Sequence, residues 1–164
     1  MAKEPEKGKD SVLSSFKSLS QEEKIELLFS LVMSLKEKKD SDLIPVSIFD
    51  NERLSILEAL VKYMKENLRL RHVAIGTILR RSDKTIWTTY QKSKQKMPES
   101  FASIFSDINI PVSAFSDRTF TAFESLVYWL KEKGMTNHEI GVRLRRDDRT
   151  IWSVYDRVKK KKNG

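Results

Sequence analysis

The chain has 164 residues but no cysteine, and it contains only five glycines, four prolines and two histidines. Without cysteine it forms neither a disulfide nor a cysteine-ligated zinc site, and two histidines argue against a catalytic metal centre built from the protein. The longest apolar-rich run, residues 25–35, is too short to span a bilayer, which needs about 20 residues. Residues 1–5 do not lead into an apolar signal core. The sequence therefore predicts a soluble, cytoplasmic protein with no metal and no cofactor.

Positive charge is in excess and is unevenly distributed. Lys and Arg number 31 against 23 Asp and Glu, which gives a net charge of +8. Residues 1–43 have a net charge of −1, residues 44–109 of +4 and residues 110–164 of +5. With 39% hydrophobic and 33% charged residues, the chain is too apolar to be disordered throughout and too charged to be embedded in a membrane. We therefore expect a polyanionic partner, either nucleic acid or an acidic surface, for the last three quarters of the chain.

Part of the chain occurs twice. The sequence Ile-Pro-Val-Ser at 44–47 returns at 110–113, and the twelve residues 79–90 match 144–155. Eight of these twelve are identical, where chance gives about one. The offset falls from 66 to 65 between the two matches, so one residue is deleted where a loop is expected. The chain therefore contains an internal duplication.

The duplication divides the chain into five segments. Residues 1–17 are rich in Lys, Glu, Ser and Gly, a composition typical of disorder. Residues 18–43 precede the duplicated part and contain a helical pattern. The first repeat covers residues 44–97, and the second repeat covers residues 110–164 and ends in a basic tail. Residues 98–109 form a connector between the repeats.

Two helical segments are expected outside the repeats. Ser20 and Glu23 form a capping box for a helix that ends at about Lys38. Its apolar face has a 3-4-3 spacing and comprises Ile25, Leu28, Val32 and Leu35. This face of residues 20–38 either forms a homodimer or covers the first repeat. In the connector, one or two helical turns packed on a neighbour are indicated by Pro98, Phe101, Ile104 and Phe105.

Each repeat predicts three helices, and no stretch alternates in the way that a strand would. The first helices are expected to begin at the N-caps Asp50 and Ser116. The earlier one ends near Glu66, and Gly134 ends the later one in a left-handed conformation. Their apolar stripes comprise Leu54, Leu57, Val61 and Met64 in the first repeat, and Phe120, Phe123, Val127 and Leu130 in the second.

A second and a third helix follow in each repeat. The second helices are expected at about 71–80 and 137–145, and the third helices at about 83–96 and 148–161. Thr136 and Glu139 form a capping box for the later second helix, whereas Arg71 leaves the earlier one without a cap. Ser82 and Asp147 are the expected N-caps of the third helices.

The second and third helices have the spacing of a helix-turn-helix. Apolar residues fill positions 4, 8 and 15 of its twenty-residue pattern, and glycine fills position 5, where two helices crossing at about 100–120° leave no room for a side chain. These residues are Ile75, Gly76, Leu79 and Ile86, and Ile140, Gly141, Leu144 and Ile151. With the following basic run, residues 138–141 and Thr150–Ile151 resemble region 4 of bacterial sigma factors and similar tandem regulators. The resemblance covers roughly 50 residues of each repeat and implies three-helix DNA-binding units.

Both repeats depart from that pattern in the turn. Position 9, usually glycine, is Arg80 and Arg145, and position 10, usually apolar, is Arg81 and Arg146. A left-handed conformation costs a residue other than glycine about 1 kcal/mol, so we expect a turn of different shape. The repeated arginine pair beside the third helix is a candidate phosphate contact, although a merely solvated turn is the alternative. No segment resembles a promoter-melting region, so a complete sigma factor is not expected.

The resemblance implies which side chains face bases in the major groove. They are Ser82, Asp83, Lys84, Trp87, Thr88 and Gln91 in the first repeat, and Asp147, Asp148, Arg149, Trp152, Ser153 and Asp156 in the second. Arg149 can bind guanine O6 and N7 in a bidentate manner, and Lys84 can bind the same edge less specifically. Asp83 and Asp148 more simply stabilise their helix N-termini. The tryptophans either face the groove or pack internally, and Lys159 and Lys160 of the tail either contact phosphate or only improve solubility.

The sequence thus predicts an all-α protein with two tandem three-helix, helix-turn-helix units behind an N-terminal helix. The expected partner is double-stranded DNA, and the expected role is that of a transcriptional regulator associated with the nucleoid. Two other classes stay open: an adaptor to RNA polymerase or another protein that uses the sigma-like surface, and an architectural nucleoid protein with little sequence preference. An enzyme is not expected, because the sequence shows neither a Ser/His/Asp cluster nor a phosphate-binding glycine loop.

Overall fold

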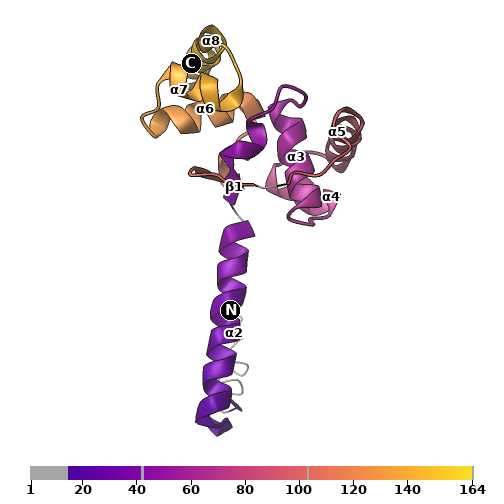
Figure 1. Cartoon of the computed structure of the whole chain (residues 1–164), viewed down its shortest axis with the longest axis vertical. Helices are drawn as coiled ribbons and strands as arrows, with labels where there is room; N and C mark the ends of the chain where they lie inside the picture. Colours follow the sequence, from indigo (N-terminus) through magenta and orange to yellow (C-terminus); the bar gives the residue numbers. More distant parts are fainter. Residues whose placement is uncertain (1–14, 42, 103, 164) are drawn as a thin grey trace, which may run out of the picture. The chain divides into compact units, whose positions relative to one another are not determined.

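The computed structural model describes residues 15–41, 43–102 and 104–163 (Figure 1). This part of the chain is mostly helical and has one two-stranded sheet, so the all-α expectation is confirmed. The chain divides into two compact units, Met1–Asp40 and Ser41–Gly164. Of the residues expected to be disordered, 1–14 lie outside the described residues and 15–17 are helical. None of the helices described is long and apolar enough to cross a membrane.

The first unit contains helix α2 (Gln21–Ser41), which continues beyond the expected end at Lys38. The expected capping box is present: the Glu23 amide donates to Ser20 Oγ over 3.2 Å, and the Ser20 amide donates to Glu23 Oε2 over 2.8 Å. Of the expected apolar face, Val32 and Leu35 lie outside the described side chains. The apolar side chains described in the first half of α2 are exposed, namely Ile25, Leu27, Leu28, Phe29 and Leu31.

Near its start, each repeat has a short 3₁₀ helix that the sequence patterns did not indicate. These helices are η1 (Val46–Phe49) and η2 (Val112–Phe115). Asp50 and Ser116, the expected N-caps of the first α-helices, are instead the C-caps that directly follow η1 and η2. The expected starts of the first α-helices are therefore wrong by about one and a half turns.

The first α-helices are α3 (Ile56–Glu66) and α6 (Ala122–Glu132). Their N-caps are Ser55 and Thr121, each of which forms a capping box with the glutamate three residues later, Glu58 or Glu124. A capping box satisfies two of the free amides of a helix end, which a lone Asp50 or Ser116 side chain does not. The expected left-handed stop after α6 is confirmed, because Gly134 has a φ of 85°.

The second and third helices lie close to their expected bounds. They are α4 (His72–Ile78) and α5 (Asp83–Lys96), and α7 (Asn137–Leu144) and α8 (Asp148–Asn163). The capping box of Thr136 and Glu139 is confirmed, and Arg71 provides no side-chain cap for α4. Ser82 and Asp147 accept hydrogen bonds from backbone amides in the first turns of α5 and α8. The basic tail extends α8, as expected.

The two repeats are joined by a short antiparallel sheet, which corrects the expectation that the chain has no strands. Its strands are β1 (Leu43–Pro45) and β2 (Asn109–Pro111). Three residues are too few for a strand to show a detectable alternation of apolar and polar residues. In the register, Ile44 pairs with Ile110, and the flanking residues pair symmetrically about them. Because Ile44 and Ile110 are equivalent in the two repeats, an approximate two-fold axis passes between them.

The hydrophobic core continues across this axis. Ile44 and Ile110 are fully buried, and the equivalent rings of Phe49 and Phe115 lie 6.0 Å apart between their centroids. Buried residues of both repeats belong to one cluster. In Figure 1, β1 lies between the group α3–α5 and the group α6–α8. The repeats are therefore two halves of one compact body.

The connector contains no helical turn in the residues described, which corrects the expectation of one or two turns. Its first part is held by the first repeat instead: Asn67 Nδ2 donates to the carbonyl of Phe101 over 3.2 Å, and the Glu99 side chain pairs with Arg53 at 2.5 Å. Near its end, Asp107 pairs with Arg143 of the second repeat at 2.8 Å. Phe101 and Ile104 pack against the core, as expected of a segment on a neighbour, but Phe105 is 89% exposed.

Candidate nucleic-acid interface

The first halves of α5 and α8 present the same set of exposed positions. In the part of the chain that the structure describes, the exposed residues there are Asp83, Lys84, Thr85 and Trp87 on α5, and Asp148, Arg149, Thr150 and Trp152 on α8. Ser82 and Asp147, which directly precede the two helices, are exposed as well. In the same turn, each helix has one fully buried isoleucine that packs in the core, Ile86 or Ile151. The expected base-facing residues at the start of each third helix therefore lie together on one exposed surface per repeat.

Trp87 and Trp152 do not pack in the protein interior. They are 54% and 60% exposed, and they directly follow the buried Ile86 and Ile151. An exposed tryptophan at equivalent places in two repeats leaves a large apolar surface in contact with water. This arrangement removes the internal-packing alternative and leaves both rings available to a partner.

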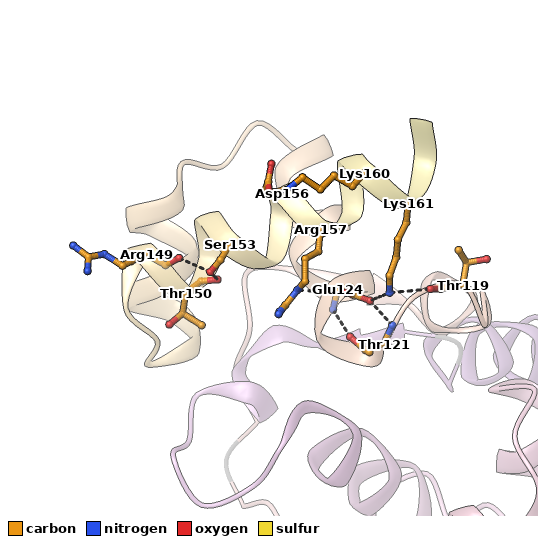
Figure 2. Close-up of polar contacts among 10 residues, drawn as sticks. All are labelled: Thr119, Thr121, Glu124, Arg149, Thr150, Ser153, Asp156, Arg157, Lys160 and Lys161. Atoms are coloured by element: carbon orange, nitrogen blue, oxygen red, sulfur yellow. Dashed lines mark hydrogen bonds and ion pairs between the residues drawn. The ribbon is translucent and has the colours of Figure 1, made fainter. Parts of the chain in front are cut away.

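The cations at the helix starts are also unengaged. Within the described residues, neither Lys84 nor Arg149 has a side-chain hydrogen bond or an ion pair, and both are exposed. Figure 2 shows the Arg149 side chain extending away from the rest of α8. The hydroxyls one turn later are engaged: Thr88 Oγ1 donates to the Lys84 carbonyl over 2.8 Å, and Ser153 Oγ donates to the Arg149 carbonyl over 2.9 Å. Gln91, near the middle of α5, is only partly exposed.

The glycines at position 5 allow the second and third helices to approach closely. A Cβ atom on Gly76 would lie 2.8 Å from the Arg81 carbonyl oxygen, and one on Gly141 would lie 2.6 Å from that of Arg146. The same Cβ atoms would lie 2.9 Å from Asp83 Oδ1 and 2.8 Å from Asp148 Oδ1. These two carboxylates therefore fold back onto the glycine of the preceding helix, which favours a role in helix capping over a base contact.

The turn between the helices is left-handed at the arginine in both repeats. Arg80 has a φ of 51° and Arg145 a φ of 48°, so the expectation of a turn of different shape is wrong. The next residue closes each turn, because the Arg81 amide donates to the Gly76 carbonyl and the Arg146 amide to the Gly141 carbonyl, both over 2.8 Å. Both left-handed residues form cross-repeat bonds: Arg145 through its side chain and Arg80 through its carbonyl.

Several of the turn arginines are bound to the other repeat. Arg145 Nε lies 2.5 Å from Asp50 Oδ1, and this ion pair raises the pKa of Arg145. Arg146 donates to the carbonyl of Asn51 over 3.4 Å. In the reciprocal place, Arg118 donates to the carbonyl of Arg80 over 2.8 Å. The turn of each repeat therefore contacts the loop before the first α-helix of the other.

Arg81, like Arg146, is partly buried, whereas Arg80 and Arg145 are exposed. The Nε atom of Arg81 is buried and has no hydrogen-bond partner among the described residues. Burial, followed by the like charge of Arg118, lowers the pKa of Arg81. Arg80 is exposed, and its carbonyl accepts the bond from Arg118. Among the four candidate phosphate contacts, Arg80 is therefore the exposed arginine whose side chain has no hydrogen bond or ion pair within the described residues.

The C-terminal ends of α5 and α8 are tied to the capping boxes of α3 and α6. Lys96 Nζ lies 2.7 Å from Glu58 Oε2, and Lys161 Nζ lies 2.7 Å from Glu124 Oε2. Lys161 also donates to the Thr119 carbonyl over 3.2 Å (Figure 2). Each glutamate thus caps one helix and fixes the far end of another, so it sets the direction of the third helix.

The pKa of each of these glutamates is lowered. Burial alone raises the pKa of Glu58 and Glu124, but hydrogen bonds from Lys96 or Lys161 and from the N-cap residue outweigh burial. Both carboxylates therefore remain charged at neutral pH although they are buried.

The tail lysines are only partly free. Lys160 pairs with Asp156 at 2.8 Å, and Lys159 Nζ lies 4.7 Å from the centroid of the Tyr155 ring. Asp156, expected to face bases, is thereby engaged within α8 (Figure 2). Lys159 and Lys160 are exposed and can still add to the local positive potential.

Sequence patterns missed Arg118 and the pairs of Glu58 with Lys96 and of Glu124 with Lys161. The glutamate and lysine of each pair are 38 or 37 residues apart, and no short motif contains both. One signal was present: the glutamates align with each other in the two repeats, and so do the lysines.

Comparison of the chain with protein-family models, curated proteins and solved structures finds no match.

Proposed function

We propose that the protein binds double-stranded DNA through α5 and α8, each laid in the major groove as a recognition helix, and that it regulates transcription at the nucleoid. The proposal rests on one observation: the exposed start of the third helix occurs in both repeats, and the two copies are related by an approximate two-fold axis. The backbone of duplex DNA has local two-fold symmetry. Paired helix-turn-helix units bind successive major grooves because the two-fold symmetry of the protein matches that of the duplex.

The proposed base contacts come from the exposed and unpaired side chains. Arg149 presents a planar guanidinium that can donate to both O6 and N7 of guanine, and Lys84 offers one point charge at the equivalent place. Trp87 and Trp152 can contact sugar or a thymine methyl group beside them. Ser82 and Asp147 differ between the repeats, so the two half-sites should be related but unequal.

The proposed phosphate contacts surround these helix starts. The side chain of Arg80 and those first-turn amides of α5 and α8 that do not bond Ser82 or Asp147 are available for phosphate, and Lys159 and Lys160 add positive charge at the end of α8. Arg145 and Arg146 have a different part in this proposal. Because they bind the first repeat, they orient the two recognition helices relative to each other more than they contact DNA.

The core shared by the two repeats sets the spacing at which α5 and α8 would bind DNA. Two units on a flexible tether bind a second half-site with an affinity set by the length of the tether. Here the strands and the cross-repeat bonds fix the spacing of the helices, so that one spacing of half-sites should be strongly preferred.

A selection from random duplex pools at two salt concentrations tests the proposal. We expect enrichment of two related half-sites at one fixed spacing. Arg149→Ala should cost about 1–3 kcal/mol on the selected site and relax preference at one position, and Lys84→Ala should cost less. Val142→Ala is the matched control, since Val142 is 64% exposed on α7, outside the proposed surface.

Two outcomes contradict the proposal. Uniform binding that only weakens with salt would support an architectural protein with little sequence preference. No binding to any duplex would leave the exposed tryptophans and cations to a protein partner, such as RNA polymerase.

A further inference from the structure

The two repeats differ in how one face of the first α-helix is covered. In the first repeat this face comprises Ala59, Lys62 and Tyr63 of α3, which are 1%, 0% and 8% exposed. The equivalent residues of α6 are Ser125, Tyr128 and Trp129, which we call the open α6 face. Tyr128 and Trp129 are only partly buried, and together with Ser125 they line a cavity of about 220 Å³.

The chain's own connector covers the face in the first repeat. After α5 ends at Lys96, the chain leaves the helix at Met97, which is itself buried. It then passes along α3, with Glu99 paired to Arg53 before the helix and the Phe101 carbonyl bound by Asn67 after it. A hydrogen bond from its own amide, then Arg53 and Lys62, lowers the pKa of Glu99. An extended segment carrying a carboxylate and a phenylalanine therefore binds this surface.

In the second repeat the chain takes another path. Lys162, the equivalent of Met97, is still within α8, and it donates a hydrogen bond to the Tyr128 hydroxyl. Among the residues that the structure describes, no segment takes the place of the connector on α6. Ala114 stands where the first repeat has the larger Ile48, which leaves space in the cavity wall. The absence of the covering segment and the smaller side chain together account for the cavity.

The open α6 face has the features of a binding surface for such a segment. Phe120 and Tyr128 stack at 6.2 Å, and the Nζ atoms of Lys162 and Lys133 lie 4.0 Å and 5.1 Å from the centroids of the Tyr128 and Trp129 rings. Asp117 also lines the cavity, but its carboxylate accepts the amide of Thr119 in its own loop.

One polar atom in the wall lacks a partner. Ser125 is 3% exposed, and its Oγ atom has no hydrogen-bond partner within the described residues. A buried hydroxyl without a partner is unfavourable and uncommon. The backbone of a bound segment can supply the missing hydrogen bond.

We infer that the open α6 face binds an extended, acidic segment of a partner protein, with an aromatic side chain as its anchor in the cavity. The aromatic anchor fills the space lined by Ala114 and Trp129, and a carboxylate of the segment pairs with Lys162 or Lys133. This surface is separate from the exposed starts of α5 and α8. Binding of such a partner therefore does not depend on the proposed DNA binding.

A peptide with the sequence of residues 97–108, added to the full chain, tests this inference. It contains Glu99 and Phe101, the carboxylate and the phenylalanine of the segment that covers α3 in the first repeat. We expect it to shift the NMR signals of the Trp129 indole and of Ser125. Replacing the phenylalanine equivalent to Phe101 by alanine in the peptide should weaken binding at least about tenfold, because hot-spot residues of interfaces are typically buried aromatic anchors.

Variants of the protein provide the second arm. Ala114→Ile restores the side chain of the first repeat, so it should fill the cavity and weaken peptide binding at least about tenfold without changing DNA binding. Val142→Ile is the matched control on an exposed position of α7. If Ala114→Ile does not fold, the peptide variant on the unchanged protein still decides.

Three results would overturn the inference. The first is the absence of any shift of the Trp129 signal at millimolar peptide. The second is binding of the alanine-substituted peptide that equals that of the original. The third is a Trp129 signal that changes on dilution together with a change from dimer to monomer, since the occupant would then be a second copy of this chain.

Discussion

Ile44 pairs with Ile110 at the centre of a two-stranded sheet, and the two residues occupy the same place in the two repeats. A duplicated chain that pairs equivalent residues forms an internal dimer with a two-fold axis between them. Both side chains are fully buried, so the axis passes through the core and not through a solvated gap. This relationship explains why residues 44–164, which contain two repeats, form one body.

A substitution on this axis should destabilise both repeats at once. Ile110→Ala leaves a cavity in the core that the two repeats share, so it should lower the free energy of unfolding by about 2–5 kcal/mol. Because the core is shared, calorimetry should give one cooperative transition for Ser41–Gly164 in both the parent and the variant. Two separate transitions in the parent protein would contradict the shared core. Val142→Ala, on an exposed residue, is the control and should change stability by less than about 0.5 kcal/mol.

The tight approach of the second and third helices gives a prediction for the glycines. Gly141→Ala brings a Cβ atom to 2.6 Å from a backbone carbonyl, and Gly76→Ala to 2.8 Å, so both should destabilise, and the former more strongly. We expect about 1–3 kcal/mol for each, since backbone must move. Chemical denaturation measures the difference. Gly134→Ala is the control, because nothing lies within 4 Å of its Cβ position and only its positive φ is strained, which costs about 1 kcal/mol.

The sequence predicts the local parts of this fold well. The bounds of α5 and α7 and the capping boxes of Ser20 and Thr136 depend on residues within one helical turn, and the structure confirms them. The N-caps Asp50 and Ser116 were wrong because the true caps, Ser55 and Thr121, compete for the same helix and have a glutamate three residues later.

The features that sequence patterns missed depend on contacts between distant residues. The strands are three residues long and exist only because each repeat supplies one to the other. Propensity alone argued against a left-handed arginine at Arg80 and Arg145. The bonds that support this conformation come from Arg118 and Asp50, which belong to the opposite repeat. For the candidate site, spacing indicated which helices matter, but it did not show that Arg145 and Arg146 are engaged.

The exposed tryptophans should contribute to DNA affinity but not to the stability of the fold. Trp87→Ala and Trp152→Ala should each lower affinity for the selected duplex on the order of tenfold, as expected for aromatic side chains at the centre of an interface. Both side chains are more than half exposed, so thermal unfolding should shift little. Fluorescence anisotropy with a labelled duplex measures the affinity. The matched control is Phe105→Ala, an 89% exposed aromatic in the connector, and an equal loss with this variant would remove the special role of the tryptophans.

The pairs of Glu58 with Lys96 and of Glu124 with Lys161 should make stability depend on acid. The pKa of each glutamate is lowered by folding, so its contribution is fully present above the unfolded value near 4.5 and is lost as the pH falls through the lower folded value. Glu124→Gln keeps an acceptor for the capping box but removes the charge, so it should cost about 1–3 kcal/mol at pH 7. Urea unfolding of parent and variant between pH 7 and pH 3 measures this difference, which should shrink towards zero below pH 4.5. A difference that stays constant over that range would mean that lost packing, and not the charge on Glu124, causes the destabilisation.

The same variant should also weaken DNA binding at pH 7. Lys161 lies at the far end of α8, so loss of its ion pair with Glu124 leaves the orientation of that helix less well fixed. Lys161→Met should reproduce the effect.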